Sequence, residues 1–158
     1  MRKTKTVTVD FGPEGYRDRG KVFILTEMPA SEAEEWATHA LTLVAQAGVN
    51  LPEGIAHYGW SGLAIVGLDA LMKVDFLKAR PLLDQMMACV QIVPDPQRPL
   101  PHRISDMDVE EVQTRLWLRD QVFELHSGFC VADALREMMS SAAMLTNSRS
   151  ATPTSPSP

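Results

Sequence analysis

The length, composition and charge of the chain limit which folds and which partners are possible. The chain has 158 residues, 45% of them hydrophobic, which is enough to bury a core without a metal or a disulfide. Its net charge of −5 disfavours nucleic acid as the main partner, because phosphate binding needs a concentrated positive field. The charged start lacks a secretion signal, no apolar stretch is long enough to span a membrane, and there are only two cysteines. We therefore expect a soluble protein in a reducing cytoplasm.

The first strand-forming segments predict a β-hairpin over about residues 5–28. Residues 6–9 alternate β-branched side chains, and residues 21–26 form a second run with strong strand preference. Glycine and proline between the two runs favour a turn. Because an isolated hairpin is marginal in water, we expect it to lie on helices; pairing with further strands or with a partner is the alternative.

Two helices are expected next. Ser31 is predicted as the N-cap of the first, with Glu34 completing a capping box, and Gly48 as its left-handed end. The segment 60–74 is apolar almost all round, which is typical of a helix in the centre of a fold. Its two glycines, Gly62 and Gly67, are interpreted as points of close helix contact.

A proline-rich connector separates the next two predicted helices. Asp75 is expected to cap a turn, and Pro81 suits the first turn of a helix over residues 82–93. The prolines of residues 94–101 then favour an extended chain. Ser105 or Asp106 is expected to begin a helix that runs to His126.

That helix has apolar residues on two opposite sides, which predicts burial on both. One stripe contains Val109, Val112, Leu116 and Phe123, and the other contains Leu118, Val122 and Leu125.

A last helix is predicted over residues 131–145, followed by a Ser, Thr and Pro tail, 146–158, that should be disordered. The expected fold class is thus mainly α. We expect one domain, residues 1–145, with about five helices and an N-terminal β-hairpin.

Residue patterns for catalysis or metal binding are weak. The cysteines are too far apart in the sequence for a paired zinc motif, and no glycine loop has the ending that cradles phosphate. His126 and Cys130 are four residues apart, so one helical face could bring them together as a reactive pair. Gly128 between them argues against this, and a buried thiol with a helix-end histidine is the simpler interpretation. We expect no catalytic residue, metal or cofactor.

A partner-binding surface is the more favoured hypothesis. Trp117 lies between the two apolar stripes and beside charged residues, where a second protein could cover it. With it we group four further predicted contact residues, and core packing is the alternative for all of them. The predicted partner-binding residues are Trp117, Leu118, Val122, Leu125 and Phe129.

Several short motifs resemble one protein family. Residues 20–30 read GKVFILTEMPA, residues 33–37 read AEEWA, and residues 115–119 read RLWLR, followed by residues 122–129. Together with residues 88–96, these segments resemble the tail assembly chaperones of long-tailed bacteriophages. The resemblance covers most of residues 20–130 and contains no catalytic signature.

This resemblance implies a protein made in the cytoplasm of the infected bacterium and absent from the mature virion. Such a chaperone binds the helical tape measure protein, keeps it soluble and helps the tail tube protein assemble around it. The tail tube protein as a second partner, a homo-oligomer and a longer frameshifted form stay open. The main alternative is a helical adaptor, a structural subunit, or a small phage inhibitor of a host protein in a stable complex. An enzyme that uses Cys130 and His126 is a distant third.

Overall fold

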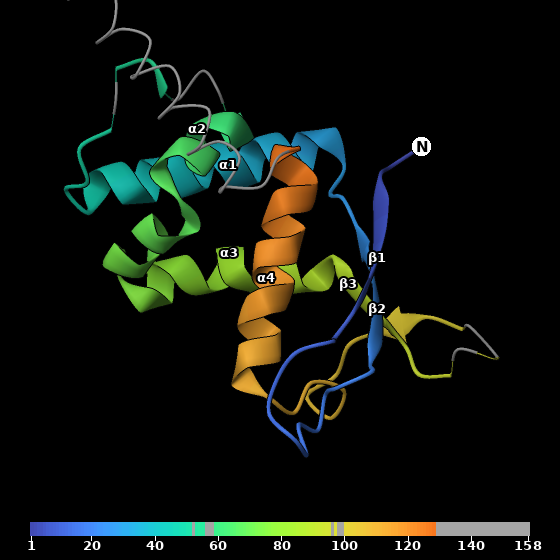
Figure 1. The fold of residues 1–158 in the computed structure, drawn as a ribbon. Helices are drawn as coiled ribbons and strands as arrows, with labels where there is room; N and C mark the ends of the chain where they lie inside the picture. Colours follow the sequence, from blue (N-terminus) through green and yellow to red (C-terminus); the bar gives the residue numbers. More distant parts are fainter. Residues whose placement is uncertain (52, 56–58, 96, 98–99, 129–158) are drawn as a thin grey trace, which may run out of the picture.

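A computed structural model describes the chain except for residues 52, 56–58, 96, 98–99 and 129–158. It joins a small sheet to a group of helices (Figure 1). The elements, in chain order, are β1 (Thr4–Thr8), β2 (Val22–Thr26), α1 (Ala30–Gln46), α2 (Gly59–Val66), the 3-10 helix η2 (Leu68–Lys73), α3 (Phe76–Ala88), β3 (Val90–Val93), β4 (His102–Arg103) and α4 (Val112–Ser127).

The sheet makes the expected mainly α class wrong, because the fold is mixed α/β. It contains four antiparallel strands in the order β1-β2-β3-β4. The expected hairpin of β1 and β2 is present, with Val7 opposite Phe23, but Phe23 also faces Ile92 of β3. Residues 90–93 had been predicted as the end of a helix. Their β-branched side chains instead pair with β2, whose second edge would otherwise be open.

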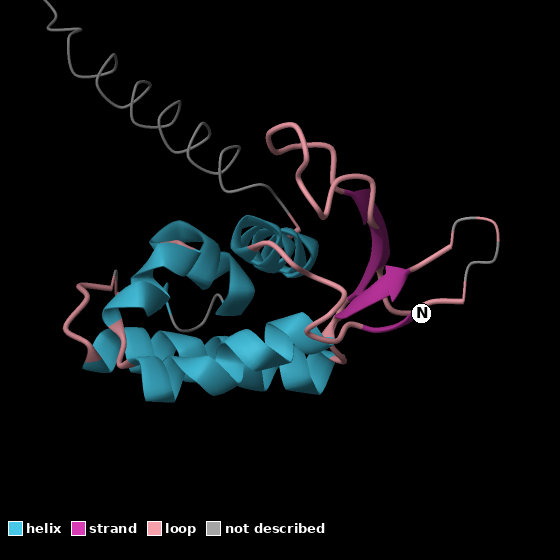
Figure 2. Ribbon diagram, turned by 90° about the horizontal axis from the view of Figure 1, so that it is seen from below, coloured by secondary structure: helices cyan, strands magenta, loops and turns pink. Residues whose placement is uncertain are grey.

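The helices lie together on one side of the sheet, as Figure 2 shows. They and the sheet share one core, to which α1, α3, α4 and the central strands all contribute. Its largest fully buried side chains include Trp36, Phe23, Phe123, Leu82 and Leu118.

Helix α1 begins two residues earlier than predicted and without a side-chain cap. It starts at Ala30 after Pro29, so the expected Ser31 cap and its capping box with Glu34 are wrong. The carbonyl of Pro29 accepts the Ala33 N–H at 2.9 Å and closes the first turn. The expected end is confirmed, since Gly48 follows the helix with a φ of 79°.

The apolar segment after α1 is two short helices rather than one. Gly67 has a φ of 84°, a left-handed conformation that ends α2 and separates it from η2. Gly62 does mark a close approach, but to a loop: a Cβ there would lie 2.5 Å from the backbone oxygen of Ile55. The predicted single helix over residues 60–74 is therefore wrong.

Helix α3 lies earlier in the chain than predicted. Asp75 caps it as expected, because its carboxylate accepts the Leu77 N–H at 3.0 Å. The helix already begins at Phe76, so Pro81 lies inside it. It ends at Ala88, where the chain turns directly into β3.

Helix α4 begins at Val112, several residues after the predicted start at Ser105 or Asp106. The reason is a competing acceptor: the buried carboxylate of Asp18 takes the N–H groups of Glu110 and Glu111, at 3.0 and 2.9 Å. Gly128 ends the helix with a φ of 76°. The predicted helix 131–145 and the tail 146–158 lie outside the described residues.

Candidate protein-binding site

The apolar side chains of α4 form two stripes that are covered to different extents. On the first stripe, Val112 is 76% exposed and Leu116 is 52% exposed. Phe123 belongs to the same stripe two turns later, but it is buried beneath Trp60 of α2, with ring centroids 5.5 Å apart. Val109, ahead of the helix, is partly buried against the core, so the stripe is covered at both ends and open at Val112 and Leu116 between them. We call Val112 and Leu116 the open stripe.

The opposite stripe holds most of the predicted contact residues, and it faces the core. Leu118 and Val122 are fully buried, and Leu125 packs partly buried against the same core. Buried side chains cannot touch a partner while the fold stays closed. Phe129 lies outside the described residues.

Trp117 is partly buried by the β1–β2 loop. Its indole meets the ring of Phe11 edge-on at a centroid distance of 5.2 Å, and Phe11 in turn contacts Tyr16 at 5.7 Å. The loop thus covers the tryptophan that the sequence had suggested for a partner.

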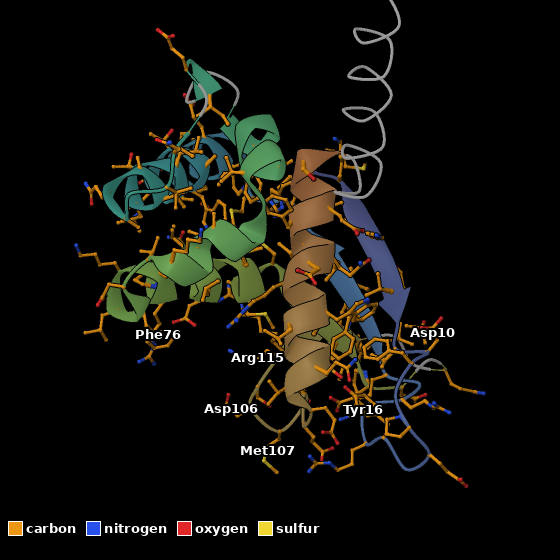
Figure 3. The ribbon with its side chains drawn as sticks, turned by 60° about the vertical axis from the view of Figure 1, so that its left-hand side comes forward. Asp10, Tyr16, Phe76, Asp106, Met107 and Arg115 are labelled. Atoms are coloured by element: carbon orange, nitrogen blue, oxygen red, sulfur yellow. The ribbon has the colours of Figure 1, made fainter. Side chains whose placement is uncertain are left out.

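A groove adjoins the open stripe. It lies between α3 and the segment from β4 to α4, and its volume is about 270 Å³. Asp84 and Met87 line it from α3, and Arg103, Asp106 and Arg115 line it from the other side. Figure 3 looks onto this side of the molecule and shows Arg115 between α3 and α4.

Further large apolar side chains are exposed around these elements. Phe76 and Leu77 are exposed at the beginning of α3, and Met107 is exposed in the loop ahead of α4. In Figure 3, Phe76 and Met107 both extend away from the helices. Single exposed apolar side chains are common on protein surfaces, so these three are not assigned to the site.

A buried ionic cluster holds the N-terminal end of α4. Besides the two backbone N–H groups, the Asp18 carboxylate accepts a hydrogen bond from Lys21 Nζ at 2.7 Å. Burial alone would raise the pKa of Asp18, but these hydrogen bonds outweigh it and hold the pKa below its usual value. Arg17 adds an ion pair to Glu111 at 2.7 Å. The open stripe is therefore presented on a fixed helix start.

His126 holds the C-terminal end of α4. Its Nε2 accepts the Met28 N–H at 2.8 Å, and its Nδ1 donates to the Val122 carbonyl at 2.8 Å. The ring also stacks on Trp60, with centroids 4.6 Å apart. These bonds require the neutral imidazole, and burial lowers the pKa of His126 in agreement with it.

This environment gives His126 a structural role, because both ring nitrogens are bonded to the backbone. The predicted alternative, a reactive pair with Cys130, depends on a residue outside the described part of the chain.

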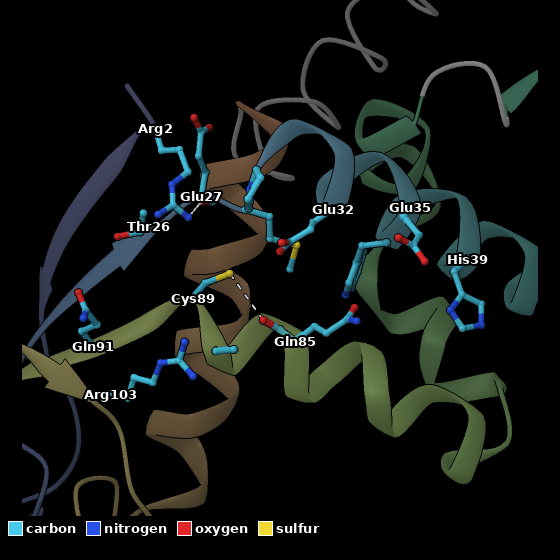
Figure 4. A pocket seen from close by; sticks show the side chains of 14 residues that line it. Arg2, Thr26, Glu27, Glu32, Glu35, His39, Gln85, Cys89, Gln91 and Arg103 are labelled. Carbon is cyan, nitrogen blue, oxygen red and sulfur yellow. Dashed lines mark hydrogen bonds between the residues drawn. The ribbon is translucent and has the colours of Figure 1, made fainter.

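A polar cleft of about 450 Å³ lies at the other side of α3, between the end of β2, α1 and β3 (Figure 4). Charged side chains line it, among them Arg2, Glu32 and Arg103. Cys89 also lines it, and its Sγ donates to the Gln85 carbonyl at 3.6 Å. Burial, assisted by the charge of Glu32, raises the pKa of this thiol to about 11, so it is protonated at neutral pH.

Two kinds of site are not found within the described part of the chain. Its histidines, cysteines and acidic residues form no group of three that could hold a metal ion. None of its helices is long and apolar enough to cross a membrane.

No family model, no curated protein and no solved structure matches the chain.

Proposed function

We propose that the protein binds an apolar helical segment of another protein through the open stripe and the adjoining groove. In this proposal it acts as a tail assembly chaperone, which holds the tape measure protein soluble in the infected bacterium and assists assembly of the tail tube. The observation that most directly supports this proposal is that Val112 and Leu116 are exposed on a helix whose two ends are both anchored. The proposed role follows from this surface together with the resemblance in sequence.

The size of the open stripe favours modest affinity. Covering an exposed Val or Leu side chain contributes roughly 1.5–3 kcal/mol, and association itself costs several kcal/mol in lost freedom of motion. A contact of this size is easily released. Many copies along one long partner would protect it through combined weak contacts, and each copy would leave as assembly proceeds.

Two groups with nucleophilic or basic chemistry, Cys89 and His126, are held in states that do not suit catalysis. The Cys89 thiol is protonated at neutral pH, and the imidazole of His126 has both nitrogens engaged with backbone groups. Neither is available as a nucleophile or as a base in this conformation.

Co-expression with the candidate tape measure protein tests this function. We expect the tape measure protein to become soluble and to co-purify with the chain. If it stays insoluble and no complex forms, the chaperone proposal is wrong.

Mass spectrometry of purified phage particles separates the chaperone from the structural subunit. A chaperone should be missing from the particles, whereas a subunit should be present in them. A complex with a host protein and not with a tail protein would instead favour the inhibitor.

A further inference from the structure

Two arginines share one face of α4 with the open stripe. Val112, Arg115, Leu116 and Arg119 are spaced i, i+3, i+4 and i+7, the spacing that places four side chains on a single side of a helix. Whatever covers Val112 and Leu116 therefore also meets two guanidinium groups.

Neither arginine forms an ion pair with a described residue, whereas Lys5 and three other basic residues do. Within the described residues, Arg17, Lys21 and Arg80 each lie within 4 Å of a carboxylate, but neither Arg115 nor Arg119 does. The nearby carboxylate of Asp84 is bound to Arg80 at 3.7 Å.

Arg119 is also incompletely hydrogen-bonded. Its side chain is partly buried, and its Nε is shielded from solvent without a hydrogen-bond partner among the described residues. A buried donor left without an acceptor is costly, because it has given up water and gained nothing in return. The like charge of Arg115 adds an unfavourable interaction, which the charge of Asp84 offsets only in part. A partner's carboxylate beside the accessible part of this guanidinium would relieve the repulsion.

The chemistry of this face thus defines its occupant. Guanidinium groups bind carboxylates through paired, charge-assisted hydrogen bonds. Because Asp84 and Asp106 line the groove beside Arg115, we place the partner's carboxylates on the face of α4 and not inside the groove. Val112 and Leu116 are one helical turn apart, which suits apolar residues one turn apart on a partner helix.

We propose that Arg115 and Arg119 bind acidic side chains of an amphipathic partner helix whose apolar residues cover Val112 and Leu116. This inference rests on the proposed function and adds the chemistry of the segment that is bound. It also explains how a chain with a net charge of −5 can bind an acidic partner: the attraction is local to this face.

Three synthetic helical peptides test the inference. They share one leucine stripe and differ only in the residues flanking it, which are glutamate, glutamine or lysine. Fluorescence anisotropy with the full chain should show the glutamate peptide binding about tenfold more tightly than the glutamine peptide. The lysine peptide should bind most weakly.

Substitution of the arginines should remove this preference. In Arg119→Met and Arg115→Met, which keep apolar stems, the glutamate and glutamine peptides should bind equally. Arg119→Lys keeps the charge but loses the paired hydrogen bonds, so it should retain part of the preference. Thermal unfolding of each variant shows whether it is folded.

The outcomes separate this inference from the proposed function. Equal binding of the glutamate and glutamine peptides to the unaltered chain, or no binding of any peptide, would overturn the inference. The proposed surface itself is judged by Leu116→Asp, which should weaken every peptide. A preference for glutamate that persists in both methionine variants would place the carboxylate site elsewhere and likewise overturn the inference.

Discussion

The imidazole of His126 accepts the backbone N–H of Met28 at 2.8 Å, and so joins the end of α4 to the junction between β2 and α1. Asp18 does the equivalent at the other end of α4, where it holds two backbone N–H groups. Two polar side chains, His126 and Asp18, thus tie the two ends of this helix to distant parts of the chain.

The hydrogen bond between His126 and Met28 predicts a loss of stability in mild acid. The pKa of His126 is lowered in the folded state, so the unfolded chain binds the proton more readily. The contribution of His126 is complete above its ordinary pKa of about 6.5 and is lost as the pH falls through the lowered folded value. Melting temperatures at about pH 7.5 and about pH 5 should therefore differ more for the unaltered chain than for His126→Gln.

The exposed His39 provides the control for this experiment. His39→Gln should follow the unaltered chain at both pH values. If His126→Gln has the same pH dependence as the unaltered chain, the imidazole is not the group that titrates.

The hydrogen bonds of Asp18 predict that a small substitution at this residue lowers the stability of the fold strongly. Asp18→Asn keeps the size of the side chain but removes the charge that binds Lys21 and the N–H groups of Glu110 and Glu111. Because the carboxylate is buried, we expect the free energy of unfolding to fall by about 3 kcal/mol in urea denaturation near neutral pH. Asp10→Asn, at an exposed position on the same loop, should change it by less than about 0.5 kcal/mol. Equal effects would show that the buried carboxylate does not hold α4.

Truncation of two leucines on α4 should separate the core from the surface. Leu118 is fully buried, so Leu118→Ala should lower the free energy of unfolding by about 3 kcal/mol. Leu116 is half-exposed, so Leu116→Ala should lower it by less than about 1 kcal/mol. The same denaturation curves measure both variants, and similar losses would mean that the first stripe is covered as well.

The thiol of Cys89 should react slowly. Its pKa of about 11 lies well above the ordinary value of a thiol, so the folded chain holds about a hundredfold less thiolate near pH 8 than the unfolded chain. In a Cys130→Ser background, labelling with a disulfide reagent should be slower by about that factor in buffer than in guanidinium chloride. Similar rates in both solutions would show that burial does not protect the Cys89 thiol.

Local sequence signals predicted which helices and strands form better than they predicted where each one begins and ends. The hairpin, the left-handed end at Gly48 and the cap at Asp75 depend on neighbouring residues, and each is found in the structure. The start of α4 depends on Asp18, more than ninety positions away in the chain. No local pattern indicates that the N–H groups of Glu110 and Glu111 are taken by a distant carboxylate.

The same distinction explains the candidate site. Both stripes of α4 can be read from the sequence, because helical periodicity is local. Which stripe stays open depends on Trp60 and on the core beneath Leu118, and so on the tertiary fold. Residues 90–93 show a related effect, since they form a strand only because β2 offers an edge.

The most direct test compares two leucine substitutions in a binding titration with the tape measure protein. Leu116→Asp places a charge on the open stripe, and Leu100→Asp makes the same change at an exposed leucine in the connector between β3 and β4. We predict that Leu116→Asp weakens binding at least tenfold without a matching fall in melting temperature, whereas Leu100→Asp binds like the unaltered chain. Equal affinities for all three proteins would contradict the claim that this stripe holds the partner.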